Sequence, residues 1–200
     1  ISTDSVFNCQ DGQSKPREDD RRKPLNAYGS QKARAEDAVM AATGGKALVV
    51  RTNFFGWSPA PQRGLAEWAL RKLRQGHQVS GFSDVFFNPL YIRDATDILV
   101  KLLDKNTEGL IHLLGAQCLS KLSFLQNMAD VFSLDQQLIK KSCLTDAGFN
   151  AVRPANTCLA TSRLEEILGY RLPSAEEGLK RMLCEEYTLR DKLHTLEKYS

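Results

Sequence analysis

Residues 26–53, NAYGSQKARAEDAVMAATGGKALVVRTN, decide the fold because they pass from a helical pattern into an apolar strand. The alanine-rich part predicts a helix over 26–42, and the glycines of "TGG" at 43–45 end it because glycine tolerates the left-handed C-cap geometry. The run "KALVVRTN" at 46–53 has the pattern of a strand covered on both faces in a parallel sheet. Together with an apolar first strand at 1–7, this order predicts a βαβ unit.

The rest of the chain alternates between the same two patterns. Apolar spacing and capping residues, such as Ser120, Gly169 and the pair Ser174 and Glu177, mark the ends of the further elements. We expect helices near 64–75, 95–105, 119–132, 161–169 and 174–199, strands at 109–115 and 137–143, and extended segments at 78–94 broken at Pro89. Alternating strands and helices predict an α/β fold with a parallel sheet.

The composition excludes several classes of protein. Charged residues make up 26% and hydrophobic residues 42% of the 200 residues, and no apolar run approaches the roughly 20 residues that cross a bilayer. The net charge is only +3, and basic residues alternate with acidic ones, as in "REDDRRK" at 17–23. We therefore expect a soluble protein that binds neither nucleic acid nor a membrane.

The cysteines and histidines indicate no metal site. The five cysteines show no C-x-x-C spacing, and the three histidines lie far apart. An odd number of scattered cysteines predicts reduced thiols in a cytoplasmic protein rather than a disulfide framework.

Tyr28 and Lys32 form the first candidate for chemistry. They lie four residues apart, so their side chains leave the same face of the predicted helix. A nearby ammonium favours the phenolate of a tyrosine and brings its proton transfer into a useful range. By itself the pair also fits two polar residues on the solvent side of an ordinary helix.

Polar residues at the ends of two predicted strands favour the chemical interpretation. The first strand carries "STD" at 2–4, and the strand at 46–53 ends in "RTN". Open parallel sheets bind their ligands at the carboxyl ends of the strands. We therefore expect hydroxyl, phenol, ammonium and amide groups to meet at one edge of the sheet.

The order of these motifs resembles the extended short-chain dehydrogenase/reductases, and within them the dTDP-4-dehydrorhamnose reductase group. The likeness rests on "ISTDSVF", "PLNAYGSQKARAED", "LVVRTNFFG", "FSDVFFNPLYIRD", "GLIHLLG" and "RPANTCLATSRLEEILGYRLPSAEEGL". It implies part of a doubly wound, Rossmann-type parallel sheet over residues 1–56. It further implies a smaller, mainly substrate-binding region over 57–200, with 95–115 returning to the sheet.

The resemblance also implies a reaction and its residues. NAD(P)H would reduce a nucleotide-linked 4-keto-6-deoxy sugar, with Tyr28 giving a proton to the C4 oxygen, Lys32 holding the nicotinamide ribose, and Thr3 bonding to the carbonyl oxygen. Donors placed where charge develops stabilise it best. The remaining expected contacts are Arg51, Thr52 and Asn53 with the cofactor, and Ser2, Asp4, Phe54, Asn88 and Arg153 with the substrate.

The glycine-rich pyrophosphate loop of that family is absent from the sequence. The chain also starts abruptly at Ile1, so we expect the first half of the nucleotide-binding domain to precede it, and the 200 residues alone to be inactive. The sequence does not decide between NAD and NADP, and it identifies neither the sugar nor whether the protein forms a homodimer. The alternative hypothesis is a non-catalytic subunit of the same fold that binds a sugar nucleotide or NADP, as the regulatory subunit of methionine adenosyltransferase does in this superfamily.

Overall fold

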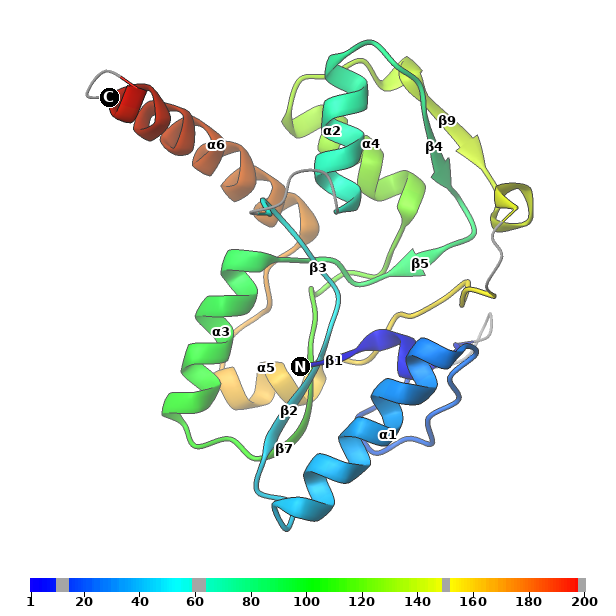
Figure 1. Cartoon of the computed structure of the whole chain (residues 1–200), viewed down its shortest axis with the longest axis vertical. Coiled ribbons are helices and arrows are strands. Elements are labelled where there is room, and N and C mark those ends of the chain that lie inside the picture. The colour runs from blue at the N-terminus through cyan, green and yellow to red at the C-terminus, as the bar shows by residue number, and fades with distance from the viewer. Residues whose placement is uncertain (10–14, 59–63, 149–151, 198–200) are drawn as a thin grey trace.

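The computed structural model describes residues 1–9, 15–58, 64–148 and 152–197, which form an α/β molecule (Figure 1). Its helices are α1 (Ala27–Ala42), α2 (Leu65–Arg74), α3 (Ile92–Asp104), α4 (Lys121–Val131), α5 (Ser162–Leu168) and α6 (Ala175–Glu197), with 3₁₀ turns η1 (Asp4–Val6), η2 (Gln136–Leu138) and η3 (Leu144–Ala147). The strands are β1 (Ser2–Thr3), β2 (Leu48–Thr52), β3 (Phe54–Phe55), β4 (Val79–Phe82), β5 (Phe86–Phe87), β6 (Leu90–Tyr91), β7 (Gly109–Leu113), β8 (Leu119–Ser120) and β9 (Ile139–Ser142).

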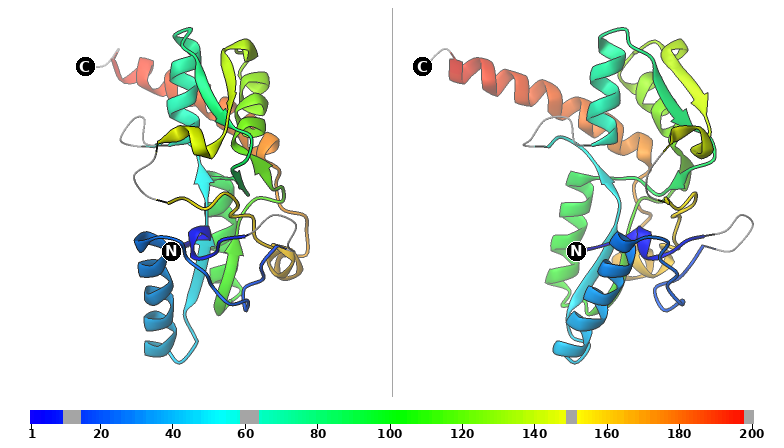
Figure 2. Two further views of the ribbon diagram at one scale, coloured as in Figure 1. Left: turned by 90° about the vertical axis from the view of Figure 1, so that its right-hand side faces the viewer. Right: turned by 45° about the vertical axis from the view of Figure 1, so that its right-hand side comes forward.

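A parallel sheet in the order β1-β2-β7 forms one part of the molecule. Helix α1 lies on one side of it and α3 on the other (Figures 1 and 2). Val50 and Ile111 from the sheet, Ile98 and Leu102 from α3 and Leu164 from α5 form one buried apolar cluster. Strand β7 pairs with β2 in this sheet, five residues to five.

The remaining elements pack above the carboxyl end of this sheet. Helices α2 and α4 pack against each other beside the parallel pair β4–β9, and the first turns of α6 cover them (Figure 1). Their shared core includes Leu70, Phe124, Met128, Leu179 and Met182, all buried. The farther part of α6 projects away from this core in both views of Figure 2.

Local side-chain bonds explain where several elements begin. The side chain of Asn26 accepts a hydrogen bond from the Gly29 amide and begins α1. Ser174 and Glu177 form the predicted capping box before α6, with reciprocal bonds of 2.6 and 3.2 Å.

Two predicted boundaries are wrong. The strand expected over 1–7 ends at Thr3, because its side chain accepts a hydrogen bond from the Ser5 amide and starts the 3₁₀ turn. Helix α3 begins at Ile92 rather than at 95, immediately after the short strand β6. The helix expected over 174–199 is seen from Ala175 to Glu197, and its last predicted residues lie outside the described ranges.

Candidate active site

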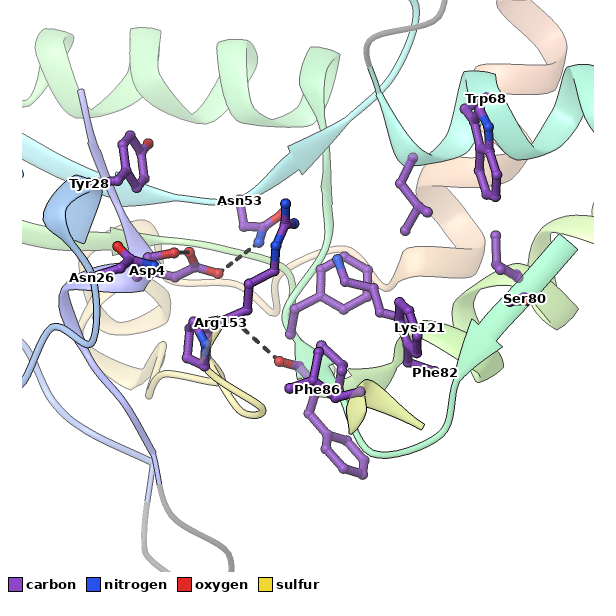
Figure 3. A pocket seen from close by; sticks show the side chains of 18 of the residues that line it. Asp4, Asn26, Tyr28, Asn53, Trp68, Ser80, Phe82, Phe86, Lys121 and Arg153 are labelled. Carbon is purple, nitrogen blue, oxygen red and sulfur yellow. Dashed lines mark hydrogen bonds between the residues drawn. The ribbon is translucent and has the colours of Figure 1, made fainter. Parts of the chain in front are cut away.

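A cavity of about 970 Å³ lies between the carboxyl end of the sheet and the α2–α4 part of the molecule (Figure 3). One wall carries polar groups from η1, α1 and the end of β2, and the opposite wall is largely aromatic and aliphatic. Its lining includes Asp4, Ser5, Asn26, Tyr28, Asn53, Trp68, Phe86, Phe87, Lys121, Arg153 and Thr157.

Asp4 and Asn53 form the centre of the polar wall. Asp4 follows β1 and Asn53 follows β2, so the parallel pairing of these strands brings the two side chains together. Asn53 Nδ2 donates to Asp4 Oδ2 at 2.7 Å, while the hydroxyls of Thr3 and Ser5 each donate to Asp4 Oδ1 at 3.2 Å. The carboxylate of Asp4 is therefore held by three neighbours.

Tyr28 stands at the edge of this wall in the first turn of α1. Its side chain is 53% exposed and lines the cavity (Figure 3). A Cβ added to the next residue, Gly29, would lie 2.3 Å from the Ser5 carbonyl oxygen, so α1 meets η1 more closely than any larger residue allows. One turn later, Lys32 Nζ donates to the Ile1 carbonyl oxygen at 3.2 Å. These two contacts hold the start of α1 against the β1–η1 segment.

Thr3 is buried next to Asp4, and its hydroxyl already bonds within the β1–η1 segment. It does not line the cavity as the structure stands. Thr52, its partner in the sheet register, is also buried, and its Oγ1 has no hydrogen-bond partner among the described residues.

Three predicted ligand contacts have another role in the structure. Arg51 is 1% exposed and forms a double contact with Glu36 at 2.8 and 2.9 Å, and Ser2 Oγ donates to the same carboxylate at 2.5 Å. Asn88 joins the Gly115 carbonyl oxygen to the Leu159 amide. Arg51, Ser2 and Asn88 therefore brace the fold, and the predictions that they contact cofactor or substrate are corrected.

Glu36 is the centre of the buried network. Arg22 also contacts it, at 2.9 Å. Burial alone would raise the pKa of Glu36, but hydrogen bonds from Arg51, Ser2 and Arg22 hold this pKa below its ordinary value. A buried carboxylate paired in this way is a structural element.

Phe54 and Arg153 complete the predicted substrate contacts. Phe54 is 53% exposed on β3 and does not line the cavity. Arg153 does line it and extends toward the Asp4–Asn53 pair (Figure 3). Arg153 thus stays a candidate ligand, whereas the position of Phe54 does not support a contact inside the cavity.

Several residues that line the cavity were not predicted from the sequence. Trp68 lines the cavity together with Phe86 and Phe87. Lys121 projects into it from the first residue of α4, and its Nζ lies 3.3 Å from the centre of the Phe87 ring. No spacing in the sequence links these residues to Tyr28, since only the packing of α2 and α4 above the sheet brings them there.

A disulfide joins Cys118 to Cys158, which contradicts the prediction that all five thiols are reduced. The bond connects the residue before β8 with the segment that carries Thr157, next to the cavity. The prediction failed because 40 residues separate the partners and only the tertiary structure brings their Cα atoms to 5.6 Å. Cys9, Cys143 and Cys184 are free thiols.

Within residues 1–9, 15–58, 64–148 and 152–197, no three His, Cys, Asp or Glu side chains gather closely enough to hold a metal ion. In the same part of the chain, no helix combines the length and the apolar character that crossing a membrane requires.

The chain is similar in sequence to known proteins and in fold to solved structures. The chain is 28% identical over 183 residues to a probable low-salt glycan biosynthesis reductase of Haloferax volcanii, and 31% identical over 186 residues to methionine adenosyltransferase 2 subunit beta of Xenopus tropicalis. These matches cover 89% and 86% of this chain but 60% and 53% of the relatives, so the chain spans little more than half of their length.

The crystal structure of dTDP-4-dehydrorhamnose reductase from Bacillus anthracis, in complex with NADP, superposes with a TM-score of 0.82 at 24% identity, over 92% of this chain and 64% of that one. The predicted α/β class with a Rossmann-type parallel sheet is thereby confirmed. A family model, the RmlD substrate binding domain, matches residues 1–188. Because this match covers almost the whole chain, the protein belongs to the RmlD substrate-binding domain family.

Proposed function

We propose that this chain carries the substrate pocket and the proton donor of an NAD(P)H-dependent reductase of a nucleotide-linked 4-keto-6-deoxy sugar. One observation carries the proposal: Tyr28 stands at a large cavity whose opposite wall is aromatic and whose near wall presents Asp4 and Asn53. A sugar nucleotide needs both kinds of surface, since its base stacks on rings and its hydroxyls need hydrogen-bond partners. The reductase relatives support the same reaction class.

The residues at the carboxyl end of β2 fit the nicotinamide end of a dinucleotide. The buried hydroxyl of Thr52 has no hydrogen-bond partner within the described part of the chain, and Lys32 projects from α1 on the side that carries Tyr28. Lys32 would hold the nicotinamide ribose, with Thr52 and Asn53 beside it. The bound coenzyme supplies the hydride for the reduction.

The chain's own groups handle the proton and the orientation of the sugar. Tyr28 donates its phenolic proton to the sugar C4 oxygen as negative charge develops there, and Lys32 steadies the phenolate that remains. Asp4 and Asn53 bind sugar hydroxyls and fix the angle of the ring. Thr3 is the second donor in this scheme, and its hydroxyl must exchange its bond to Asp4 to reach the carbonyl oxygen.

A non-catalytic subunit is the second candidate, and two observations favour it. The chain is 31% identical to a protein named as a subunit of methionine adenosyltransferase. In addition, the hydroxyl of Thr3 is engaged with Asp4 and Ser5 rather than directed into the cavity. In this alternative the pocket binds a nucleotide ligand without turnover.

Replacement of Tyr28 by phenylalanine in the full-length protein separates the two candidates. We expect the wild type to oxidise NADPH when a dTDP-linked 4-keto-6-deoxy sugar is added, and Tyr28→Phe to lower kcat by about 10²–10⁴-fold with KM little changed, because only proton donation is lost. Tyr170→Phe is the matched control, since that exposed tyrosine lies outside the cavity. A wild type that binds NADPH but turns over no keto-sugar would establish the subunit instead.

A further inference from the structure

Lys121 has an unusual environment for a lysine. Its side chain is largely enclosed by the cavity wall, with the ring of Phe87 under its ammonium and Val79 and Leu125 in the same wall. Its backbone amide donates to the Val85 carbonyl oxygen at 2.8 Å, which fixes the start of α4 against the approach to β5. Among the described residues, no carboxylate or carbonyl oxygen accepts a hydrogen bond from its Nζ.

The nearest carboxylate does not neutralise this ammonium. Asp4 attracts Lys121, but both of its oxygens accept hydrogen bonds from other side chains, and it forms no ion pair with Lys121. Arg153 approaches the same space from the other side of the cavity and repels Lys121 (Figure 3). The cavity therefore presents the ammonium of Lys121 beside a carboxylate whose oxygens are already occupied.

Such an arrangement is costly without a ligand, because an enclosed charge loses hydration that a ring face replaces only in part. We propose that Lys121 binds a phosphate group of the nucleotide part of the substrate, with the nucleoside lying against the aromatic wall next to it. This inference rests on the proposed function and assigns to Lys121 a role in recognising the substrate.

Binding of dTDP and of thymidine to the full-length protein tests this role. We expect Lys121→Met to weaken dTDP binding by about 10- to 100-fold in isothermal titration calorimetry, the usual effect of losing a charge-assisted hydrogen bond. Thymidine, which has no phosphate, should bind both proteins equally. Lys121→Arg should restore most of the dTDP affinity, and Lys105→Met, an exposed lysine outside the cavity, should leave it unchanged.

The pH dependence of binding provides an independent signature. Burial of the ammonium lowers the pKa of Lys121 to about 8, with Asp4 opposing this shift and Arg153 adding to it. Because the charged form binds phosphate, dTDP affinity should fall as the pH rises between about 7 and 9. This fall should be absent in Lys121→Met and in Lys121→Arg.

The comparison of dTDP with NADPH also shows whether Lys121 binds a phosphate of the substrate or of the coenzyme. If NADPH affinity rather than dTDP affinity fell in Lys121→Met, the lysine would serve the coenzyme and the proposal would be overturned. Equal dTDP affinity of the wild type and Lys121→Met would overturn it as well, although keto-sugar turnover could still stand. If instead the proposed function is wrong, dTDP binding should still depend on Lys121, but the protein should not oxidise NADPH when the keto-sugar is added.

Discussion

Two polar clusters share helix α1 and differ in how completely their charges are paired. Around Glu36, in the middle of the helix, the carboxylate is held by two arginines and a serine. At the start of the helix, Tyr28 faces a cavity in which the ammonium of Lys121 has a ring but no acceptor among the described residues. The comparison teaches that burial of a charge does not distinguish structure from function, whereas the presence of its partner does.

Glu36→Gln breaks the paired cluster and should have the largest effect on stability. The substitution leaves Arg51 buried without its counter-charge, which costs about 3–5 kcal/mol of unfolding free energy. Urea denaturation followed by circular dichroism measures the loss. Asp37→Asn is the matched control, because Asp37 pairs with Arg22 while 66% exposed and should cost less than about 1 kcal/mol. Equal losses in both variants would contradict the buried role of Glu36.

The same cluster predicts how stability depends on pH. Since the pKa of Glu36 is depressed in the folded state, its contribution is complete above the unfolded value of about 4.3 and is lost as the pH falls through the folded pKa. Glu36→Gln should therefore lose less stability than the wild type on acidification below about pH 4, as measured by thermal melts across this range.

Removal of the Cys118–Cys158 disulfide tests the cluster at the cavity. It closes a loop of 40 residues that includes the whole of α4, so double replacement of Cys118 and Cys158 by alanine should cost about 2–4 kcal/mol. Because the bond adjoins the segment with Thr157, dTDP affinity should fall as well, while the pairing around Glu36 is retained. Cys184→Ser, an exposed free thiol, is the control. No change in melting temperature on addition of dithiothreitol would contradict this prediction.

Gly29→Ala tests the close contact between α1 and η1, and it should have the smallest effect on stability. Alanine would favour the helix by about 1 kcal/mol, but its Cβ would meet the Ser5 carbonyl oxygen at 2.3 Å, and displacing backbone costs about 1–3 kcal/mol. We expect a net loss of about 1–2 kcal/mol and a clear fall in kcat, since Tyr28 moves with the helix. Gly64→Ala, at the N-cap of α2, has space for a methyl group and should leave kcat unchanged, although alanine caps a helix less well than glycine.

The sequence predicted the elements better than their contacts. The capping residues Ser120 and Ser174 and the apolar pattern of β2 act within a few residues, so helix and strand positions follow from local chemistry. The parallel pairing of β4 with β9, by contrast, joins segments about sixty residues apart and was not predicted.

The candidate site divides in the same way. Tyr28, Asp4 and Asn53 line the cavity, because strand ends and the start of α1 meet at the carboxyl edge of a parallel sheet. Arg153 lines it too, and the ligand contacts of all four stay predictions. Ser2, Arg51 and Asn88 have the right polarity and position in the sequence but point to protein partners. Lys121 was missed because its sequence neighbours are those of an ordinary helix start.

By itself, then, the sequence determined the order of helices and strands, their caps, and the meeting of polar strand ends at one edge of a parallel sheet. Only the tertiary structure decided which charges are neutralised, which cysteines are joined, and which cation faces an open cavity. The physical reason is range: backbone preferences act over a few residues, whereas the environment of a charge or a thiol depends on neighbours that the chain brings from far away.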